Sequence, residues 1–232
     1  MLHQVPFPKS LLIVTKKGMI KGEGYEIRIC RGQACPLAAL GVEHLGEGLA
    51  QILDAAQLGE FYRSLSLKSQ KRYRFRVAVS ACPNACTQVH IADFGLIAQV
   101  VPRLAGDCVA CGVCEEVCEE GAVTLQDRWP LFDVQRCLNC GLCIRACPKK
   151  VLEPEAQGFK ILVGGKLGRH PRLARELKAL ATEEEVLKTL SAVLSFYKAH
   201  CQRGERLGSV IDRQGWETFL EALLKSGQDQ AL

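Results

Sequence analysis

The spacing of apolar residues along the chain predicts short strands separated by turns and helices. An apolar run at residues 11–14 and the alternation at 25–29 predict two strands joined by a turn. Alternating apolar and basic residues over 73–79 predict a strand with one buried face, and further strands are expected at 94–101 and 159–163. The mixture of strands and helices predicts an α+β fold.

Helical spacing follows several of these strands. Pro36 suits a first helical turn, so a helix is expected from there towards Ala56 despite three glycines. Thr182 and Glu185 form a capping-box pattern ahead of a one-sided apolar stripe. Asp212 is predicted to cap a last helix that ends near Gly227. The remaining apolar stripes that predict helices lie at residues 58–65, 186–197 and 216–224.

Eight cysteines between residues 108 and 147 fall into two copies of the spacing C-x2-C-x2-C-x3-C, with Pro148 after the second copy. One tight loop presents three thiolates to a four-iron cube, and in two-cluster ferredoxins the fourth cysteine of each run binds the other cluster. Gly112 and Gly141 each follow a second cysteine, where backbone N–H groups can approach the cluster. The spacing therefore predicts two [4Fe-4S] clusters, one on Cys108, Cys111, Cys114 and Cys147 and one on Cys137, Cys140, Cys143 and Cys118.

Other uses of these cysteines fit the spacing poorly. A structural zinc site takes its four ligands as two pairs, and a disulfide scaffold is typical of a short secreted chain. The chain has 232 residues, lacks an apolar run of ~20 residues and does not begin like a signal peptide. We expect a cytoplasmic protein without a membrane span, in which thirteen cysteines indicate metal.

Four more cysteines, Cys30, Cys35, Cys82 and Cys86, form two pairs, each at the end of a predicted strand. They could hold a third [4Fe-4S] cluster, a zinc ion or no metal, and the neighbouring repeat favours iron. Each cluster on four thiolates carries about −2, so three would reduce the formal net charge of +5 to about −1. The basic composition therefore does not predict nucleic acid as a partner.

The stretch VAVSACPNACTQVHIADFGLI resembles the second cysteine motif of the siroheme-dependent sulfite and nitrite reductases. The segments GFKILVGGKLGRHPRLARE and FYKAHCQRGERLG are similar to the end of that family's iron–sulfur domain. A ferredoxin insert is similar to the arrangement in the anaerobic and dissimilatory sulfite reductases. The resemblance covers residues 28–232. It implies a reductase-type domain formed by residues 1–102 and 154–232, with a two-cluster ferredoxin module inserted at 103–153.

The resemblance also implies cofactor contacts. Cys86 would bridge the third cluster to the iron of siroheme, with Cys30, Cys35 and Cys82 completing the cluster. Siroheme has eight carboxylates and its substrate is a small anion, so arginines would bind both. The arginines expected there are Arg28, Arg31, Arg74 and Arg76, and Lys68, Lys71 and Arg72 are also available. For the basic run 68–76, the alternative is a solvated strand face.

Two departures from the family pattern keep several functions open. The first cysteine pair is spaced C-x4-C rather than C-x5-C, and 29 residues precede Cys30 where the family has a half-domain. The first hypothesis is a reductase subunit that passes electrons through its clusters to siroheme and to sulfite or nitrite. The second is an electron-transfer subunit without siroheme, and the third a structural or regulatory subunit. The expected partners are an electron-donor protein, another redox subunit that could supply the half-domain, and further copies of the chain.

Overall fold

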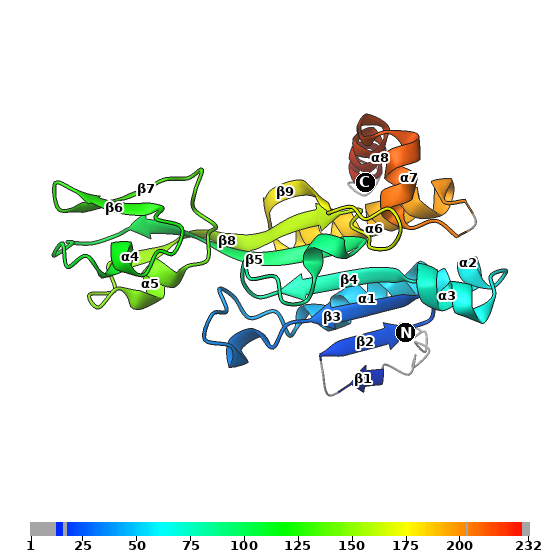
Figure 1. Cartoon of the computed structure of the whole chain (residues 1–232), viewed down its shortest axis with the longest axis horizontal. Coiled ribbons are helices and arrows are strands. Elements are labelled where there is room, and N and C mark those ends of the chain that lie inside the picture. The colour runs from blue at the N-terminus through cyan, green and yellow to red at the C-terminus, as the bar shows by residue number, and fades with distance from the viewer. Residues whose placement is uncertain (1–12, 16–17, 203, 229–232) are drawn as a thin grey trace, which may run out of the picture.

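The computed structural model describes residues 13–15, 18–202 and 204–228. Its centre is a seven-stranded sheet, and a smaller module extends from one end of that sheet (Figure 1). The strand order is β1-β2-β3-β4-β5-β8-β9. These strands are β1 (Ile13–Thr15), β2 (Met19–Gly22), β3 (Tyr25–Ile29), β4 (Phe75–Ser80), β5 (Phe94–Leu104), β8 (Leu152–Val163) and β9 (Arg175–Ala181).

Side-chain alternation gives the sheet two different faces. The central strands β3, β4 and β5 are parallel, and all other neighbours are antiparallel. Tyr25, Ile27 and Phe75 point into the main hydrophobic core and are almost fully buried. The residues between them, such as Glu26 and Arg28, belong to the opposite face. One face is therefore packed and the other is polar, which leaves the polar face available for a site.

Helices cover the packed face. The main ones are α1 (Leu45–Ala55), α6 (Glu183–His200), α7 (Leu207–Gln214) and α8 (Trp216–Gln228). Thr182 caps α6, and its hydroxyl and the Glu185 carboxylate form the predicted capping box. Each fully buried aromatic side chain in this layer contributes about 1.5–3 kcal/mol through apolar burial. The core joins chain segments from before and after the inserted module, so neither segment completes it alone.

The predicted helix from Pro36 is wrong over its first half. A short 3-10 turn, η1 (Gly32–Ala34), is followed by turns, and α1 begins only at Leu45. The N–H of Ala39 donates to the carbonyl of Ala81 at 2.7 Å. The Glu43 carboxylate accepts from the backbone N–H groups of Gln33 and Val42. Because these tertiary bonds satisfy the backbone, the segment does not need helical bonds.

The predicted strand over 73–79 starts too early. Residues Leu67–Tyr73 form helix α3, which Ser66 caps through its hydroxyl, and β4 begins at Phe75. The solvated strand face considered for the basic run is therefore wrong for residues 68–73. A short helix α2 (Leu58–Tyr62) precedes α3.

Three other boundaries differ from the prediction. Residues before Cys30 form three strands rather than two, and residues 11–12 lie outside the described part. Strand β8 begins at Leu152 rather than 159, because it pairs with β5 along its whole length. Asp212 lies inside α7 and does not cap α8, since Gly215, with a φ of 94°, separates the two helices.

The inserted module begins and ends at one place, since Leu104 at the end of β5 pairs with Leu152 at the start of β8. It contains α4 (Val113–Glu116), α5 (Leu142–Ala146) and a hairpin of β6 (Val123–Gln126) and β7 (Trp129–Phe132). Its own small core consists of Cys114, Val123, Cys143 and Leu152. Within the described residues, no helix is long and apolar enough to cross a membrane.

Candidate metal centres and cofactor face

The two cysteine runs of the module have the same backbone. Ala110 and Asn139, two residues after the first cysteine of each run, both have a φ of 54°. Gly112 and Gly141 have φ values of 81° and 66°, which favour glycine because it has no Cβ. The helices α4 and α5 then start at matching positions. The repeat in the sequence is thus also a repeat in the conformation.

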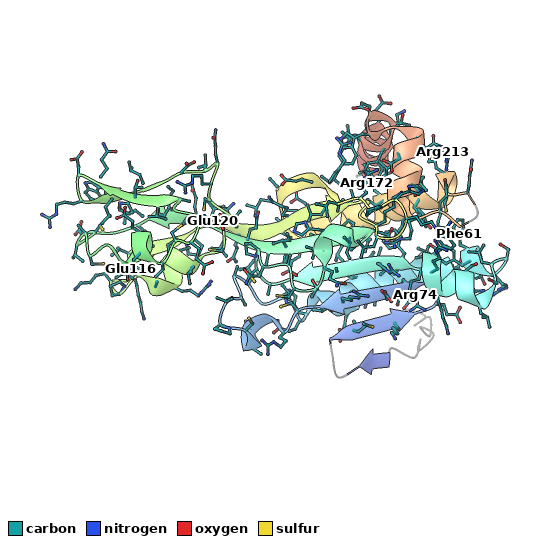
Figure 2. All side chains as sticks on the ribbon, viewed as in Figure 1. Phe61, Arg74, Glu116, Glu120, Arg172 and Arg213 are labelled. Atoms are coloured by element: carbon teal, nitrogen blue, oxygen red, sulfur yellow. The ribbon has the colours of Figure 1, made fainter. Side chains whose placement is uncertain are left out.

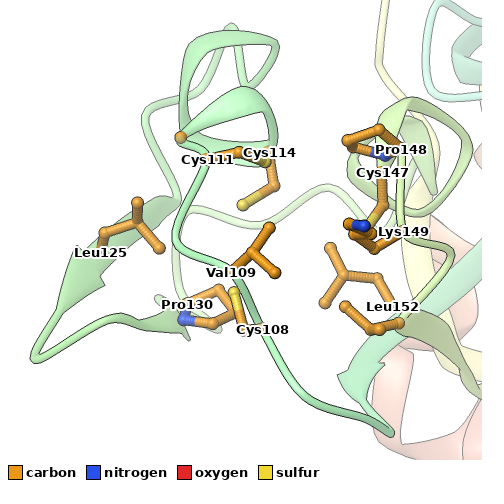
Figure 3. A pocket seen from close by; sticks show the side chains of 12 residues that line it. Cys108, Val109, Cys111, Cys114, Leu125, Pro130, Cys147, Pro148, Lys149 and Leu152 are labelled. Atoms are coloured by element: carbon orange, nitrogen blue, oxygen red, sulfur yellow. The ribbon is translucent and has the colours of Figure 1, made fainter.

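Cysteines from both runs meet at one cavity. Cys108, Cys111 and Cys114 of the first run line it together with Cys147 from the second. Figure 3 shows the side chains of Cys108, Cys114 and Cys147 around this space, with the β6–β7 hairpin on one side. The remaining walls are mostly apolar: Val109, Leu125, Pro130, Val151 and Leu152. These four cysteines are the set predicted for the first cluster.

The other four cysteines of the module also lie near one another. Burial first, and then the charges of Cys140 and Cys137, raise the pKa of the Cys143 thiol to about 12. Burial likewise raises the pKa of Cys137, with Cys140 and Cys118 adding to it. Because each thiolate raises the pKa of its neighbours, all four ionise together only when a bound metal compensates their negative charge. The donor chemistry therefore fits an iron cluster.

Backbone N–H groups point at the sulfurs. The N–H of Ala110 donates to Cys108 Sγ and that of Asn139 to Cys137 Sγ, each at 3.4 Å. The N–H of Ala122 donates to Cys118 Sγ at 3.2 Å. Burial pushes the pKa of Cys147 up, but N–H groups of residues 149–152 outweigh it and lower that pKa. Such donors stabilise anionic cluster sulfur.

No three His, Cys, Asp or Glu side chains of the described residues lie close enough to hold a single metal ion. A four-iron cube spaces its cysteine ligands more widely than one ion does, and each group here consists of thiols alone. A thiol-only donor set at this spacing suits iron–sulfur clusters.

The third group of cysteines lies where two parallel strands end. Cys30 follows β3 and Cys82 follows β4, and the N–H of Cys30 donates to the Val79 carbonyl at 2.9 Å. Burial raises the pKa of Cys82, and the charges of Cys30, Cys86 and Cys35 raise it further. The structure therefore brings all four cysteines to one end of the sheet. Cys86 is exposed, whereas Cys82 is buried.

Beside this group, three predicted arginines meet on the polar face of the sheet. Arg28, Arg74 and Arg76 all lie within 3.4 Å of one carboxylate, that of Glu26. Figure 2 shows Arg74 beside β3 and β4. Three guanidinium groups share one carboxylate, which leaves a local excess of positive charge.

Two buried nitrogens on this face lack a hydrogen-bond partner among the described residues. They are the Nε atoms of Arg28 and Arg76. The Nε of Arg76 lies 3.2 Å from Glu26 but without hydrogen-bond geometry. Burial, and next the charge of Arg206, lower the pKa of Arg76. An added anion could satisfy both donors, so the residues present fit a carboxylate-bearing group.

The other basic candidates do not join this cluster. Arg31 is exposed, and its side chain makes no hydrogen bond or ion pair within the described part of the chain. Lys71 and Arg72 lie on the exposed side of α3, where Arg72 stacks on the ring of Tyr73. For Lys68 the structure gives the helix but not the side chain.

The loop after Cys82 folds back over the polar face. The hydroxyl groups of Ser80 and Thr87 form a hydrogen bond of 2.6 Å, and Arg28 donates to the side-chain oxygen of Gln88 at 2.5 Å. The two residues that follow Cys86 therefore contact the polar face of the sheet directly. The sequence places these motifs fifty residues apart, and only the parallel pairing of β3 with β4 brings them together.

Two important residues were missed from the sequence. Glu26 could have been suspected because a charge flanked by Tyr25 and Ile27 must face away from the core. Asp93 is 1% exposed and accepts from Arg206 Nε at 2.8 and 2.9 Å. It also accepts from the backbone N–H groups of Arg76 and Leu207. Asp93 thereby joins β4, β5 and α7 beside the site.

Comparisons with known proteins identify a family and several relatives. The family described as nitrite and sulphite reductase 4Fe-4S domain matches residues 49–229. The dissimilatory-type sulfite reductase subunit beta of Archaeoglobus fulgidus is 30% identical over 163 residues, which are 63% of this chain and 44% of that protein. The coenzyme F420-dependent sulfite reductase of Methanocaldococcus jannaschii is 29% identical over 91% of this chain and 33% of its own length.

The solved structure of dissimilatory sulfite reductase I has a similar fold. It matches with a TM-score of 0.59 at 18% identity, over 85% of this chain and 51% of that one. At this identity the likeness concerns the fold alone. The chain spans a third to a half of the length of the curated relatives it matches.

Proposed function

Since the chain belongs to the nitrite and sulphite reductase 4Fe-4S domain family, we propose that it is the electron-carrying and cofactor-binding part of a sulfite or nitrite reductase. The observation that carries this proposal is that four thiols gather where β3 and β4 end, on the same two strands as arginines with unsatisfied nitrogens. Twelve cysteines would hold three [4Fe-4S] clusters. Two clusters would lie in the inserted module and one at the end of β3 and β4.

In the module, Cys108, Cys111, Cys114 and Cys147 would bind the first cluster, and Cys118, Cys137, Cys140 and Cys143 the second. The shared cavity supports the first set, and the mutual effects on pKa support the second. N–H groups that donate to sulfur would favour the reduced, more negative state of each cluster. The chain's own role here is to fix the ligands and exclude water around them.

On the sheet, Cys30, Cys35, Cys82 and Cys86 would bind the third cluster, and Cys86 would also reach siroheme. Bound siroheme supplies the iron at which the substrate anion is reduced. Arg28 and Arg76 would donate to siroheme carboxylates or to the anion through nitrogens that are unsatisfied among the described residues. Arg74 would add charge, whereas Arg31 is exposed and does not share the Glu26 carboxylate with them. A redox partner subunit could complete the pocket.

A second candidate function is electron transfer without siroheme. Glu26 favours it, because its buried carboxylate already neutralises part of the charge of the three arginines. In that case the third cluster would be a relay to another subunit, and no substrate would bind here.

The test is anaerobic purification from cells that make siroheme, followed by an iron count and a visible spectrum. Three clusters give about 12 irons per chain, siroheme adds one more with a chlorin-type band, and two clusters give about 8. Cys86→Ser should lower the iron count by about four and remove the band, whereas Cys201→Ser should change neither. A wild-type sample with about 12 irons and no band would favour the electron-transfer function. An iron count unchanged in Cys86→Ser would refute the third cluster.

A further inference from the structure

The two halves of the inserted module share one backbone but have different surroundings. A Cβ added to Gly141 would lie 3.3 Å from the Cβ of Val100 on β5. A Cβ added to Gly112, the matching residue, would meet no heavy atom of the described residues within 4 Å. The second half is therefore packed on the sheet, and the first half is open.

Hydrogen bonds confirm which half contacts the sheet. The N–H of Val100 donates to the Asn139 carbonyl at 2.7 Å, and Gln99 donates to the Leu138 carbonyl at 3.4 Å. Val100 and Cys140 also form an isolated β-bridge. The loop of Cys137, Cys140 and Cys143 thus lies directly on β5, between the cavity of Cys108 and the body of the protein.

On the open half, little protein separates the cavity from solvent. Cys111 is exposed, and Val109, which lines the cavity, is 48% exposed. The module holds about a fifth of the chain but five of the ten exposed large hydrophobic side chains among the described residues. These five are Val109, Trp129, Leu131, Val134 and Leu138. Val109 places an exposed apolar side chain directly at the cavity, and such side chains at a site are typical of a surface that another protein covers.

The charge around this surface indicates the kind of partner. Residues 105–121 carry five carboxylates and no Lys, Arg or His, although two lysines follow Cys147 and one of them, Lys149, lines the cavity. The whole module, residues 103–153, has eight Asp or Glu against six Lys or Arg, while the whole chain has 25 against 30. The module is therefore acidic on an otherwise basic chain, and such a charge distribution steers a basic protein to it.

We propose that electrons enter at the cluster of Cys108, Cys111, Cys114 and Cys147, from a one-electron carrier protein whose contact surface is basic. This rests on the proposed function, because it assumes that the module binds its two clusters. In the entry step the carrier loses one electron and the cluster gains it, with no bond made or broken. The cluster of Cys118, Cys137, Cys140 and Cys143, packed on β5, receives the electron next.

Two variants with the same charge change test the entry point. Glu115→Gln/Glu116→Gln alters the open half next to Gly112, and Glu119→Gln/Glu120→Gln alters the segment after Cys118. Figure 2 shows Glu116 farther from the main sheet than Glu120. Glu115→Asp/Glu116→Asp keeps the charge and serves as the control. Iron counts and visible spectra of all variants should match the wild type.

The probe is cytochrome c, a basic one-electron carrier protein. The clusters are first reduced, and stopped-flow spectroscopy then follows the transfer of one electron from the module to ferric haem. At low salt, Glu115→Gln/Glu116→Gln should slow this bimolecular reaction about two- to fivefold, and added salt should slow the wild type. The Glu119→Gln/Glu120→Gln variant should be affected less.

An equal or larger effect in Glu119→Gln/Glu120→Gln, or a wild-type rate independent of salt, would overturn the proposed entry point. The measurement follows the module's own clusters, so it gives an answer whether or not siroheme is bound. Failure of the proposed function would instead be seen in the iron count and in the absence of the chlorin band.

Discussion

The buried pair of Asp93 and Arg206 gives the sharpest test of what stabilises the sheet beside the site. Asp93 is 1% exposed and Arg206 8% exposed, and the closest contact between them is 2.7 Å. Burial pushes the pKa of Arg206 down, but the charge and hydrogen bonds of Asp93 outweigh it and raise that pKa. Arg206 also donates to the Gly165 carbonyl at 3.3 Å, so it holds the turn after β8 as well.

Arg206→Met should therefore destabilise the protein strongly. Asp93 would keep only the backbone donors of Arg76 and Leu207 as hydrogen-bond partners, and its buried charge would lose the countercharge that it contacts directly. Breaking a buried ion pair from one side costs about 3–5 kcal/mol. For a chain of this size, that corresponds to a loss of roughly 6–20 °C in the apparent Tm.

Arg213→Met is the matched control. Arg213 also contacts a carboxylate at 2.7 Å, that of Glu205, but both side chains are partly exposed. Such a pair contributes about 0–1 kcal/mol, so the apparent Tm should fall by at most about 4 °C. Thermal unfolding is followed by far-UV circular dichroism on anaerobic holoprotein at one scan rate. Equal shifts in the two variants would refute the argument from burial.

Three further predictions concern single side chains. Glu26→Gln should lower the stability of the protein without cofactor, because three arginines lose their shared countercharge. It should also increase the siroheme content of protein purified from siroheme-producing cells. If the wild type binds siroheme and the variant contains the same amount, Glu26 does not have a neutralising role. Gly141→Ala should speed the loss of iron to a chelator more than Gly112→Ala does. Both glycines have a positive φ, but only Gly141 faces Val100. Equal rates would contradict the packing difference between the two halves of the module. The hydrogen bond from Lys178, followed by that from the Thr182 backbone, lowers the pKa of Glu185. Its contribution to stability is therefore complete above the unfolded pKa of about 4.3 and is lost as pH falls through the lower folded pKa. A peptide of residues 175–201 should lose helicity over that pH range by circular dichroism, and Glu185→Gln should reduce the loss; an identical pH profile would contradict the capping role.

The two cysteine runs repeat in conformation as they do in spacing, because each run is local in the sequence, and their binding of clusters stays a prediction. Three cysteines of each run lie on one loop, and the positive φ angles recur at the same offsets. The predicted capping box at Thr182 is confirmed for the same reason, since both of its partners lie within four residues. The recognised family is also confirmed by the match over residues 49–229.

Features that depend on distant partners could not be predicted. The turns after Cys35 replace a helix because Ala39 bonds to Ala81. Strand β8 starts at Leu152 because β5 provides a partner there, which the local Pro154 and Gly158 do not indicate. The charge balance of the polar face depends on Glu26, whose partners Arg74 and Arg76 come from a segment about fifty residues away. These turns, this strand boundary and this charge balance all depend on which distant segments lie together in the fold. The spacing of residues along the chain does not show which segments those are.

The ladder between β5 and β8 runs from Phe94 and Val163 in the main sheet to Leu104 and Leu152 in the module, with one bulge between Val101 and Pro102. A flexible tether would let the module diffuse, and each internal electron hop would then wait for a favourable encounter. The long two-stranded ladder instead holds the module at a fixed distance from the main sheet, and with it the clusters proposed for each. Passage of electrons within the molecule should therefore be insensitive to solvent viscosity, unlike their delivery from outside.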